Sequence, residues 1–242
     1  MGLNRMDLNL VSSEHSKKVF LHTKAKDNNS NHILELTKPV EVLFEGVDLN
    51  TYFEIPDDEL PEVDVVTSLD EIGENFAFLF VGHWLQGEFG HDRKNIGQTI
   101  KVFLETFKNK HNSPALILKT ACHNGSIMDH TEVLNRINNI KNTVKAKKLP
   151  NIYLLHGELE ECEINYLYNH PKVKAMINFT KGEGFGRPLL EFSMFKKPII
   201  ASGWSGHLDF LNRDFVSLVE GKLQPIHQSD RKSTRMNSSH VS

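Results

Sequence analysis

From Asn75 onward, short apolar runs alternate with longer amphipathic segments, and this alternation constrains the fold more than any other feature of the chain. Apolar runs without period-two patterning are typical of strands that are covered on both faces. Strands that alternate with helices favour right-handed crossovers and a parallel sheet. We therefore predict a doubly wound parallel α/β domain over residues 75–224, with strands at 76–81, 115–120, 152–157, 173–179, 198–202 and 215–219.

The segments between these strands carry apolar residues at helical spacing. The clearest runs from Ile96 to Phe107, where apolar side chains recur every three or four positions. The same reasoning predicts further helices at 130–146, 159–168 and 188–195.

The first 60 residues do not fit this repeating unit. We expect a strand at 8–11, a helix from a cap at Ser12 or Ser13 to His22, and a second strand at 40–48. The acidic stretch 55–64 contains two prolines and resembles a linker. Because so short a piece cannot form its own core, we interpret residues 1–60 as the remnant of a truncated N-terminal domain plus a linker.

Composition excludes several classes of protein. A net charge of −3 provides no field that would gather nucleic acid, and no apolar run is long enough to span a membrane. The two cysteines, Cys122 and Cys162, are too few for a disulfide framework and favour a reducing, cytoplasmic setting. The histidines and cysteines do not stand at metal-ligand spacing, so no metal site is predicted.

The C-terminal stretch 229–242 contains almost no apolar residues. We expect it to be a disordered and non-native tail, translated from a sequence fused to an interrupted reading frame, although an ordinary polar tail is an alternative.

The turn after the predicted strand 173–179 is the most informative motif. It reads TKGEGFGRPLLE over residues 180–191 and leads into a helix. Its glycines allow the backbone to approach a ligand closely, and free amides at a helix start attract phosphate. Glu183 and Glu191 frame the turn, and carboxylates can accept the paired hydroxyls of a ribose or a sugar. Phosphate-binding amides beside diol-binding carboxylates predict a nucleotide-sugar site, although a simple strand-to-helix turn is the alternative.

This motif resembles the donor-binding signature of the retaining family 4 glycosyltransferases, which have the GT-B fold. The strings EGFGRPLLE, KKPIIAS, FLFVGHWL and VLFEGVDLNTYF follow the order of the family's segments, and the resemblance extends to about residue 224. It implies that residues 75–224 form the Rossmann-like C-terminal domain that binds the donor.

The resemblance also implies roles for the residues at matching positions. Glu191 would hold the nucleotide ribose, while Glu183, with Gly184 and the amides of Phe185 and Gly186, would hold the donor sugar and the nearby phosphate. Lys94 would be the family's diphosphate lysine and a catalytic residue together with Glu183, with Arg93 as its rival; a surface charge pair is the alternative for both cations. His83 stands where the family often has arginine, and it is either a phosphate donor or a turn residue. Gly206 would offer an amide to the donor, whereas Trp204 and His207 are local features of its turn.

The predicted reaction moves a sugar, of the hexosyl type, from a nucleoside diphosphate sugar to an acceptor hydroxyl with retention of configuration. Enzymes with this signature generally need no metal or other cofactor. Because the acceptor site belongs to the missing domain, we expect the fragment alone to turn over poorly, and the acceptor stays open among glycans, lipids and small molecules. The alternatives are a non-catalytic nucleotide-sugar-binding module, favoured by His83, and a nucleotide-sugar epimerase.

Overall fold

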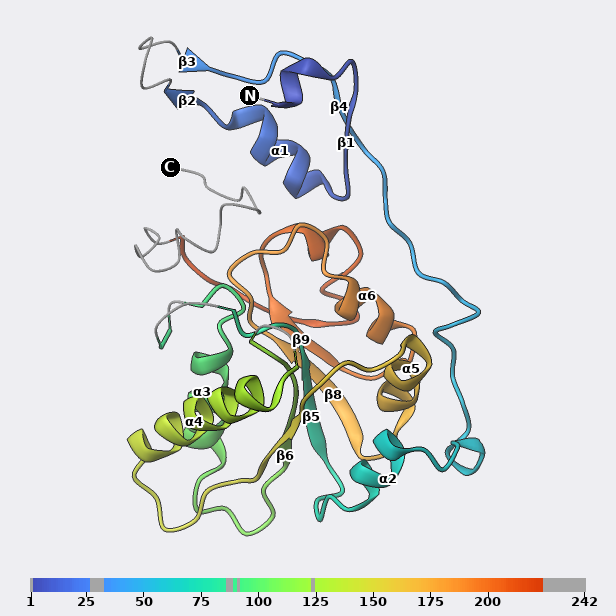
Figure 1. Cartoon of the computed structure of the whole chain (residues 1–242), viewed down its shortest axis with the longest axis vertical. Coiled ribbons are helices and arrows are strands. Elements are labelled where there is room, and N and C mark those ends of the chain that lie inside the picture. Colours follow the sequence, from blue (N-terminus) through green and yellow to red (C-terminus); the bar gives the residue numbers. More distant parts are fainter. Residues whose placement is uncertain (1, 27–32, 86–88, 91, 123–124, 224–242) are drawn as a thin grey trace.

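The computed structural model of the chain describes residues 2–26, 33–85, 89–90, 92–122 and 125–223. The predicted tail at 229–242 lies outside these residues. The main body is a six-stranded parallel sheet with helices on both faces (Figure 1). Its strands are β5 (Ala77–Val81), β6 (Ala115–Lys119), β7 (Ile152–Leu155), β8 (Val173–Asn178), β9 (Ile199–Ser202) and β10 (Ser217–Val219).

The strand order is β7-β6-β5-β8-β9-β10. The chain therefore builds the sheet outward from β5 in one direction and then, beginning with β8, in the other. This is the doubly wound Rossmann order, whose direction reverses between its first and fourth strands. The prediction of the fold class is confirmed, and the place where ligands bind in such sheets lies beyond the carboxyl ends of β5 and β8.

Alternate side chains of β5 pack into two separate hydrophobic cores, one on each face of the sheet. Ala77 and Leu79 pack under α2 (Asp64–Asp70), α5 (Glu161–Asn169) and α6 (Arg187–Ser193). Phe80 faces the opposite core, which lies under α3 (Ile96–Phe107) and α4 (Ile127–Thr143). All three β5 residues are fully buried, as expected of a central strand with helices on both faces.

Helix α4 begins three residues before the predicted start. Ser126 caps it, and the Ser126 hydroxyl accepts a hydrogen bond from the Asp129 amide. Ile127 is 86% exposed, so the first turn contributes nothing to the apolar periodicity from which the helix was predicted. A capping hydroxyl rather than burial therefore sets this boundary.

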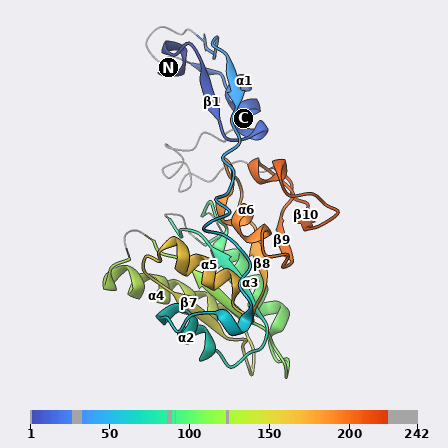
Figure 2. The same cartoon turned by 90° about the vertical axis from the view of Figure 1, so that its right-hand side faces the viewer.

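The N-terminal segment contains η1 (Gly2–Arg5), β1 (Asn9–Val11), α1 (Glu14–His22), β2 (Ala25–Lys26), β3 (Ile33–Leu34) and β4 (Val40–Val42). Strands β1 and β4 pair in parallel, and β2 pairs with β3 in antiparallel orientation. The predicted strand at 40–48 is thus wrong beyond Val42, because β1 ends at Val11 and leaves the following residues without a partner strand. Figure 2 shows this segment extending away from the α/β body.

The chain then runs down one side of the body to η2 (Asp57–Glu59) and α2, which the sequence did not predict (Figure 1). The predicted linker is fastened at its start by two asparagines of α5. Asn165 accepts a hydrogen bond from the Phe53 amide at 3.2 Å, and Asn169 accepts one from the Ile55 amide at 2.8 Å. Asn169 also donates to the Phe53 carbonyl at 3.0 Å. Two side chains one helical turn apart therefore dock an irregular segment against the domain.

We expect Asn169→Ala to lower the free energy of unfolding by about 1–3 kcal/mol, because it leaves partly buried backbone groups of Phe53 and Ile55 unpaired. Urea unfolding followed by circular dichroism measures this change. Asn142→Ala is the matched control, since Asn142 is exposed on α4. Equal stabilities of the two variants would contradict the docking role.

Candidate functional site

Three loops meet at the carboxyl edge of the sheet, where the strand order reverses. They follow β5, β8 and β9, and the backbone itself joins the first two. The Lys181 amide donates to the Arg93 carbonyl at 2.9 Å, and the Thr180 hydroxyl donates to the same oxygen at 3.3 Å. The Ser202 hydroxyl, at the end of β9, donates to the Thr180 carbonyl at 2.9 Å. The candidate site is therefore a connected structure and not a set of independent turns.

A buried ion cluster lies at its centre. Glu183, 9% exposed, forms a short ion pair with Lys94 and a second one, of 3.3 Å, with Arg93 Nη1. The same Arg93 nitrogen donates to the Gly182 carbonyl at 2.8 Å. The structure thus brings together the three charged residues predicted from two distant parts of the sequence. Two cations against one carboxylate leave a net positive charge at the site.

Burial alone would raise the pKa of Glu183, but the charges of Lys94 and Arg93 and hydrogen bonds from Lys94 and Thr180 outweigh it. The pKa is therefore lowered, and Glu183 is ionised at neutral pH. Burial lowers the pKa of Lys94, and the neighbouring Glu183 partly offsets that effect. An ionised Glu183 suits a hydrogen-bond acceptor and not a proton donor.

The side chain of Lys94, from the loop after β5, lies close to Gly82 at the end of that strand. Gly82 ends the strand, and a Cβ at this position would lie 3.6 Å from Lys94 Cε. The lysine side chain therefore passes directly over the strand end. His83, the next residue, is exposed and forms no hydrogen bond with the residues that the structure describes. Its assignment as a phosphate ligand stays a prediction.

The glycine turn after β8 presents unused amides. Within the described parts of the chain, the backbone N–H groups of Gly184, Phe185 and Gly186 donate no hydrogen bond. Gly186 has a φ of 101° and precedes α6, so it holds a conformation that favours glycine. The Phe185 ring is buried against Phe44, with centroids 4.9 Å apart, and against Phe210. A buried ring therefore fixes the backbone whose amides the sequence predicted to bind phosphate.

Glu191 does not contact the ion cluster of Glu183, Lys94 and Arg93 and has partners of its own. Glu191 was predicted to lie in the first turn of its helix. Because helix α6 begins at Arg187, Glu191 lies in the second turn, and that prediction is wrong. Its carboxylate accepts hydrogen bonds from the Tyr168 hydroxyl at 3.2 Å and from Arg187 Nε at 3.3 Å. Burial raises the pKa of Glu191, and Arg187 partly counters it. A ribose bound here would compete with partners that the sequence alone did not identify.

The loop after β9 is packed against the turn that follows β8. The Gly206 amide donates to the Glu183 carbonyl at 3.0 Å, and a Cβ at Gly206 would overlap the Gly184 carbonyl oxygen. This amide, predicted to contact the donor, already has a partner in the protein. Trp204 instead makes an edge-to-face contact with His15 of α1, with ring centroids 5.0 Å apart.

Ser205 is a residue that sequence reasoning missed. Its backbone has a φ of 85° and a ψ of −162°, a region that essentially only glycine occupies. Its hydroxyl accepts a hydrogen bond from the Glu183 amide at 2.9 Å. Together with the bond from Gly206, this contact fixes the Glu183 backbone from both sides. No periodicity or motif reveals such strain before the loops are placed.

His207 is fully buried, and its Nε2 lies 2.7 Å from the Ser202 carbonyl. A carbonyl only accepts, so Nε2 carries the proton. Burial lowers the pKa of His207, which leaves Nδ1 as an acceptor, and Nδ1 has no partner among the described residues. Helix α1 also reaches this region: its capping residue Ser13 donates to the Gly184 carbonyl at 2.5 Å.

A cluster of metal-ligand type was not expected from sequence spacing. Ligand atoms of Cys122, Asp129 and Glu132, beyond the end of β6, lie within 4.8 Å of one another. These acids have protein partners, however: Asp129 contacts His156 Nε2 at 2.8 Å, and Glu132 pairs with Arg136. Both acids of the cluster therefore already have partners in the protein.

The comparisons with known proteins concern the fold. No protein-family model matches the chain, and no curated protein matches it by sequence. Solved glycosyltransferases match it by structure. Anabaena Alr3699/HepE, solved with UDP and glucose, is 17% identical, with a TM-score of 0.56 over 89% of this chain and 50% of its own. The sucrose-phosphate synthase of Thermosynechococcus elongatus is 15% identical, with a TM-score of 0.59 over 90% of this chain and 46% of its own.

A third match is a C-terminal domain. That of the group 1 glycosyl transferase LpcC from Francisella tularensis is 14% identical, with a TM-score of 0.51, and covers 78% of this chain and 84% of its own. At such identities the matches show the fold: a Rossmann-like domain of GT-B type. The chain spans about half the length of the first two structures. No helix in the described ranges has the length and apolar character needed to cross a bilayer.

We expect Glu183→Gln to lower the free energy of unfolding at pH 7 by about 3–5 kcal/mol, because it leaves two buried cations without their counter-ion. The lowered pKa of Glu183 means that its stabilisation is complete above the ordinary glutamate value of about 4.3 and is lost as the pH falls through the folded-state pKa. Urea titrations between pH 3 and 7 should therefore show a smaller loss on acidification for Glu183→Gln than for the parent chain. Parallel pH profiles would contradict this assignment.

Ser205 allows a paired test of backbone strain. Ser205→Ala removes the bond to the Glu183 amide and keeps the strain, whereas Ser205→Gly removes both. We expect the glycine variant to be more stable than the alanine variant by about 1–3 kcal/mol, measured by thermal and urea unfolding. An alanine variant as stable as the glycine variant would show that Ser205 is not strained in solution.

Proposed function

We propose that the chain binds a nucleoside diphosphate sugar beyond the carboxyl ends of β5 and β8 and is the donor-binding domain of a retaining glycosyltransferase of the family 4 type. The observation that carries this proposal is the buried cluster of Lys94, Arg93 and Glu183 at the point where the strand order reverses. The similarity to solved glycosyltransferases supports it, since one of them was crystallised with UDP-glucose.

The diphosphate is placed against the cations and the free amides. Lys94 and Arg93 provide charge, and the N–H groups of Phe185 and Gly186 provide donors without a partner within the described residues. When the bond between sugar and diphosphate breaks, negative charge builds on the departing phosphate. Cations already fixed by Glu183 stabilise that charge without rearranging.

Glu183 is assigned to the sugar. Its lowered pKa keeps it an acceptor for sugar hydroxyls and makes it a poor general acid. This role agrees with a reaction in which the departing diphosphate is stabilised by fixed charges, and not by a pair of carboxylates such as glycoside hydrolases use. Retention of configuration and the hexosyl type of the sugar follow from the resemblance to family 4. No resident metal or cofactor is assigned to the site.

Glu191 is assigned to the ribose, which would replace Tyr168 or Arg187 as its hydrogen-bond partner. The acceptor hydroxyl would be bound by residues outside the donor domain. A cytoplasmic setting, where soluble nucleotide sugars occur, completes the proposal, and nucleic acid has no part in it.

The test is calorimetric titration of the chain with UDP, GDP and ADP and with their glucose conjugates. We expect Glu191→Ala to weaken binding of the nucleotide and of its sugar conjugate alike, by about tenfold, because both carry the ribose. Glu183→Ala should weaken the sugar conjugate more than the free nucleotide. Glu62→Ala, an exposed carboxylate on the segment before α2, is the control. Unchanged binding by Glu191→Ala would refute the ribose assignment.

Incubation with candidate acceptors distinguishes the proposal from its rivals. A glycosyltransferase transfers the sugar, a binding module leaves the donor intact, and an epimerase returns an isomerised donor. His83 is the residue that favours the binding module, because it stands where a cation is expected. We assign that cation to Lys94, whose side chain reaches over the same strand end.

A further inference from the structure

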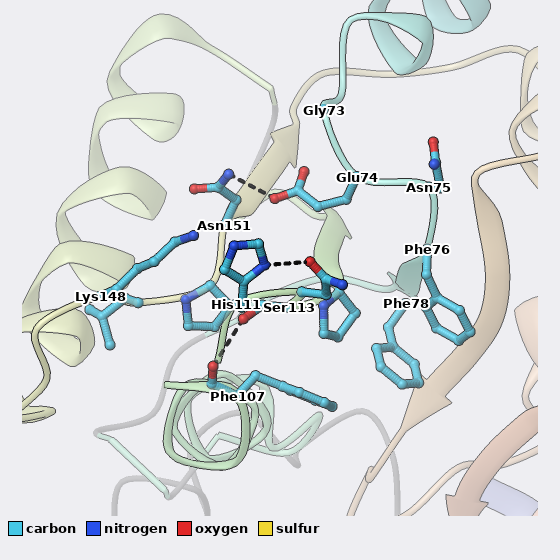
Figure 3. Close-up of a pocket in the computed structure, with 14 residues that line it drawn as sticks. Gly73, Glu74, Asn75, Phe76, Phe78, Phe107, His111, Ser113, Lys148 and Asn151 are labelled. Atoms are coloured by element: carbon cyan, nitrogen blue, oxygen red, sulfur yellow. Dashed lines mark hydrogen bonds between the residues drawn. The ribbon is translucent and has the colours of Figure 1, made fainter. Parts of the chain in front are cut away.

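A cavity of about 860 Å³ opens at the amino ends of β5, β6 and β7, on the edge of the sheet opposite the candidate donor site. It lies between the segment before β5, the loop from α3 to β6 and the loop from α4 to β7. Figure 3 shows the phenyl rings of Phe76, Phe78 and Phe107 on one side, Lys148 on the other, and His111 between them. A cavity of this size can hold a compact organic ligand.

One wall of the cavity is aromatic. The Phe76 and Phe78 rings meet edge to face, with centroids 5.0 Å apart, and Phe107 stands 6.1 Å from Phe78. Phe76 is 43% exposed although it adjoins the central strand. An aromatic wall that stays open to solvent can stack against a flat apolar ring.

The opposite wall carries positive charge. Asn109, with a φ of 60°, joins two lysine-containing loops that are distant in sequence: its side chain accepts hydrogen bonds from the Lys147 and Lys148 amides at 2.8 and 3.0 Å. Within the described parts of the chain, neither Lys110 nor Lys148 pairs with a carboxylate. Lys110 Nζ lies over the Phe107 ring, 5.0 Å from its centroid, so Lys148 is the lysine that lines the cavity.

The carboxylates near the cavity have partners other than these lysines. Glu105 lies on α3 and forms an ion pair with Lys108, the residue that caps the end of this helix. Glu74 lines the cavity, and its oxygens accept hydrogen bonds from two neutral groups, the Asn151 amide at 2.8 Å (Figure 3) and the Tyr153 hydroxyl at 3.0 Å.

We propose that this cavity is a second ligand site, for a small organic anion that carries a phosphate or carboxylate on a flat, apolar ring system. The ring would stack on Phe76 and its neighbours, and the anion would meet Lys148 and His111. The site is separate from the proposed donor site and does not depend on that function. Both halves of the ligand are required, because neither an exposed phenyl wall nor a surface lysine binds tightly alone.

The experiment is a titration of the ¹⁵N-labelled full chain with 2-naphthyl phosphate at 150 mM salt, followed by NMR. The expected result is saturable shifts of amides in 107–113 and 148–151, with inorganic phosphate and 2-naphthol each binding at least tenfold more weakly. Lys148→Glu and Phe76→Ser should each reduce the affinity at least tenfold. Both side chains are exposed, so thermal unfolding should confirm that the variants fold.

Lys147→Glu is the matched control, because it makes the same charge change beside the cavity without lining it. It should change the affinity less than threefold. An equal loss of affinity in Lys147→Glu and Lys148→Glu would show that the probe binds a general basic surface and not the cavity, and would overturn the proposal. Amide shifts confined to residues 182–186, in the candidate donor site, would also overturn the proposal. Binding of phosphatidylglycerol vesicles without any response to 2-naphthyl phosphate would overturn it as well.

Discussion

The buried ion cluster of Glu183, Lys94 and Arg93 is the interaction on which the arrangement of the site depends. Charges removed from water must be paired with good geometry, or they destabilise the fold by several kcal/mol. Here the partners come from the loops after β5 and β8, so pairing the charges also fixes those loops together. The requirement for charge balance and the requirement for a preformed site are satisfied by the same contacts.

Close backbone packing extends this constraint to the third loop. Gly206 approaches Gly184 so closely that no side chain fits, and the strained Ser205 fixes the Glu183 amide. Strain of this kind persists only where surrounding contacts determine it, and it is found where geometry matters for function. Ser13 of α1 reaches the same carbonyl of Gly184, so the N-terminal segment contributes to the order of the turn.

The fold could be predicted where the burial of an element produces a pattern of apolar residues in its sequence. The six strands of the sheet were recognised as short apolar runs, which are buried on both faces in the central strands, and the observed strand ends differ from the predicted ones by at most two residues. Prediction failed where burial is not the cause. Helix α4 starts at a capping serine before exposed residues, and β4 stops because its partner strand stops. Helix α2 is an exception, because its Val65, Val66 and Leu69 are buried; it was missed because an acidic, proline-containing stretch leads into it.

The sequence by itself determined the class of fold and the glycine turn, because local composition and spacing carry that information, and its resemblance to family 4 implied which charged residues belong near the turn. Only the tertiary structure decided which charges meet, since Lys94 and Glu183 lie 89 positions apart. It also decided that the Gly206 amide is already bonded, that Tyr168 and Arg187 hold Glu191, and that two lysine loops flank an aromatic cavity. Such contacts depend on which strands are neighbours in the sheet, and strand order is a property of the packed chain.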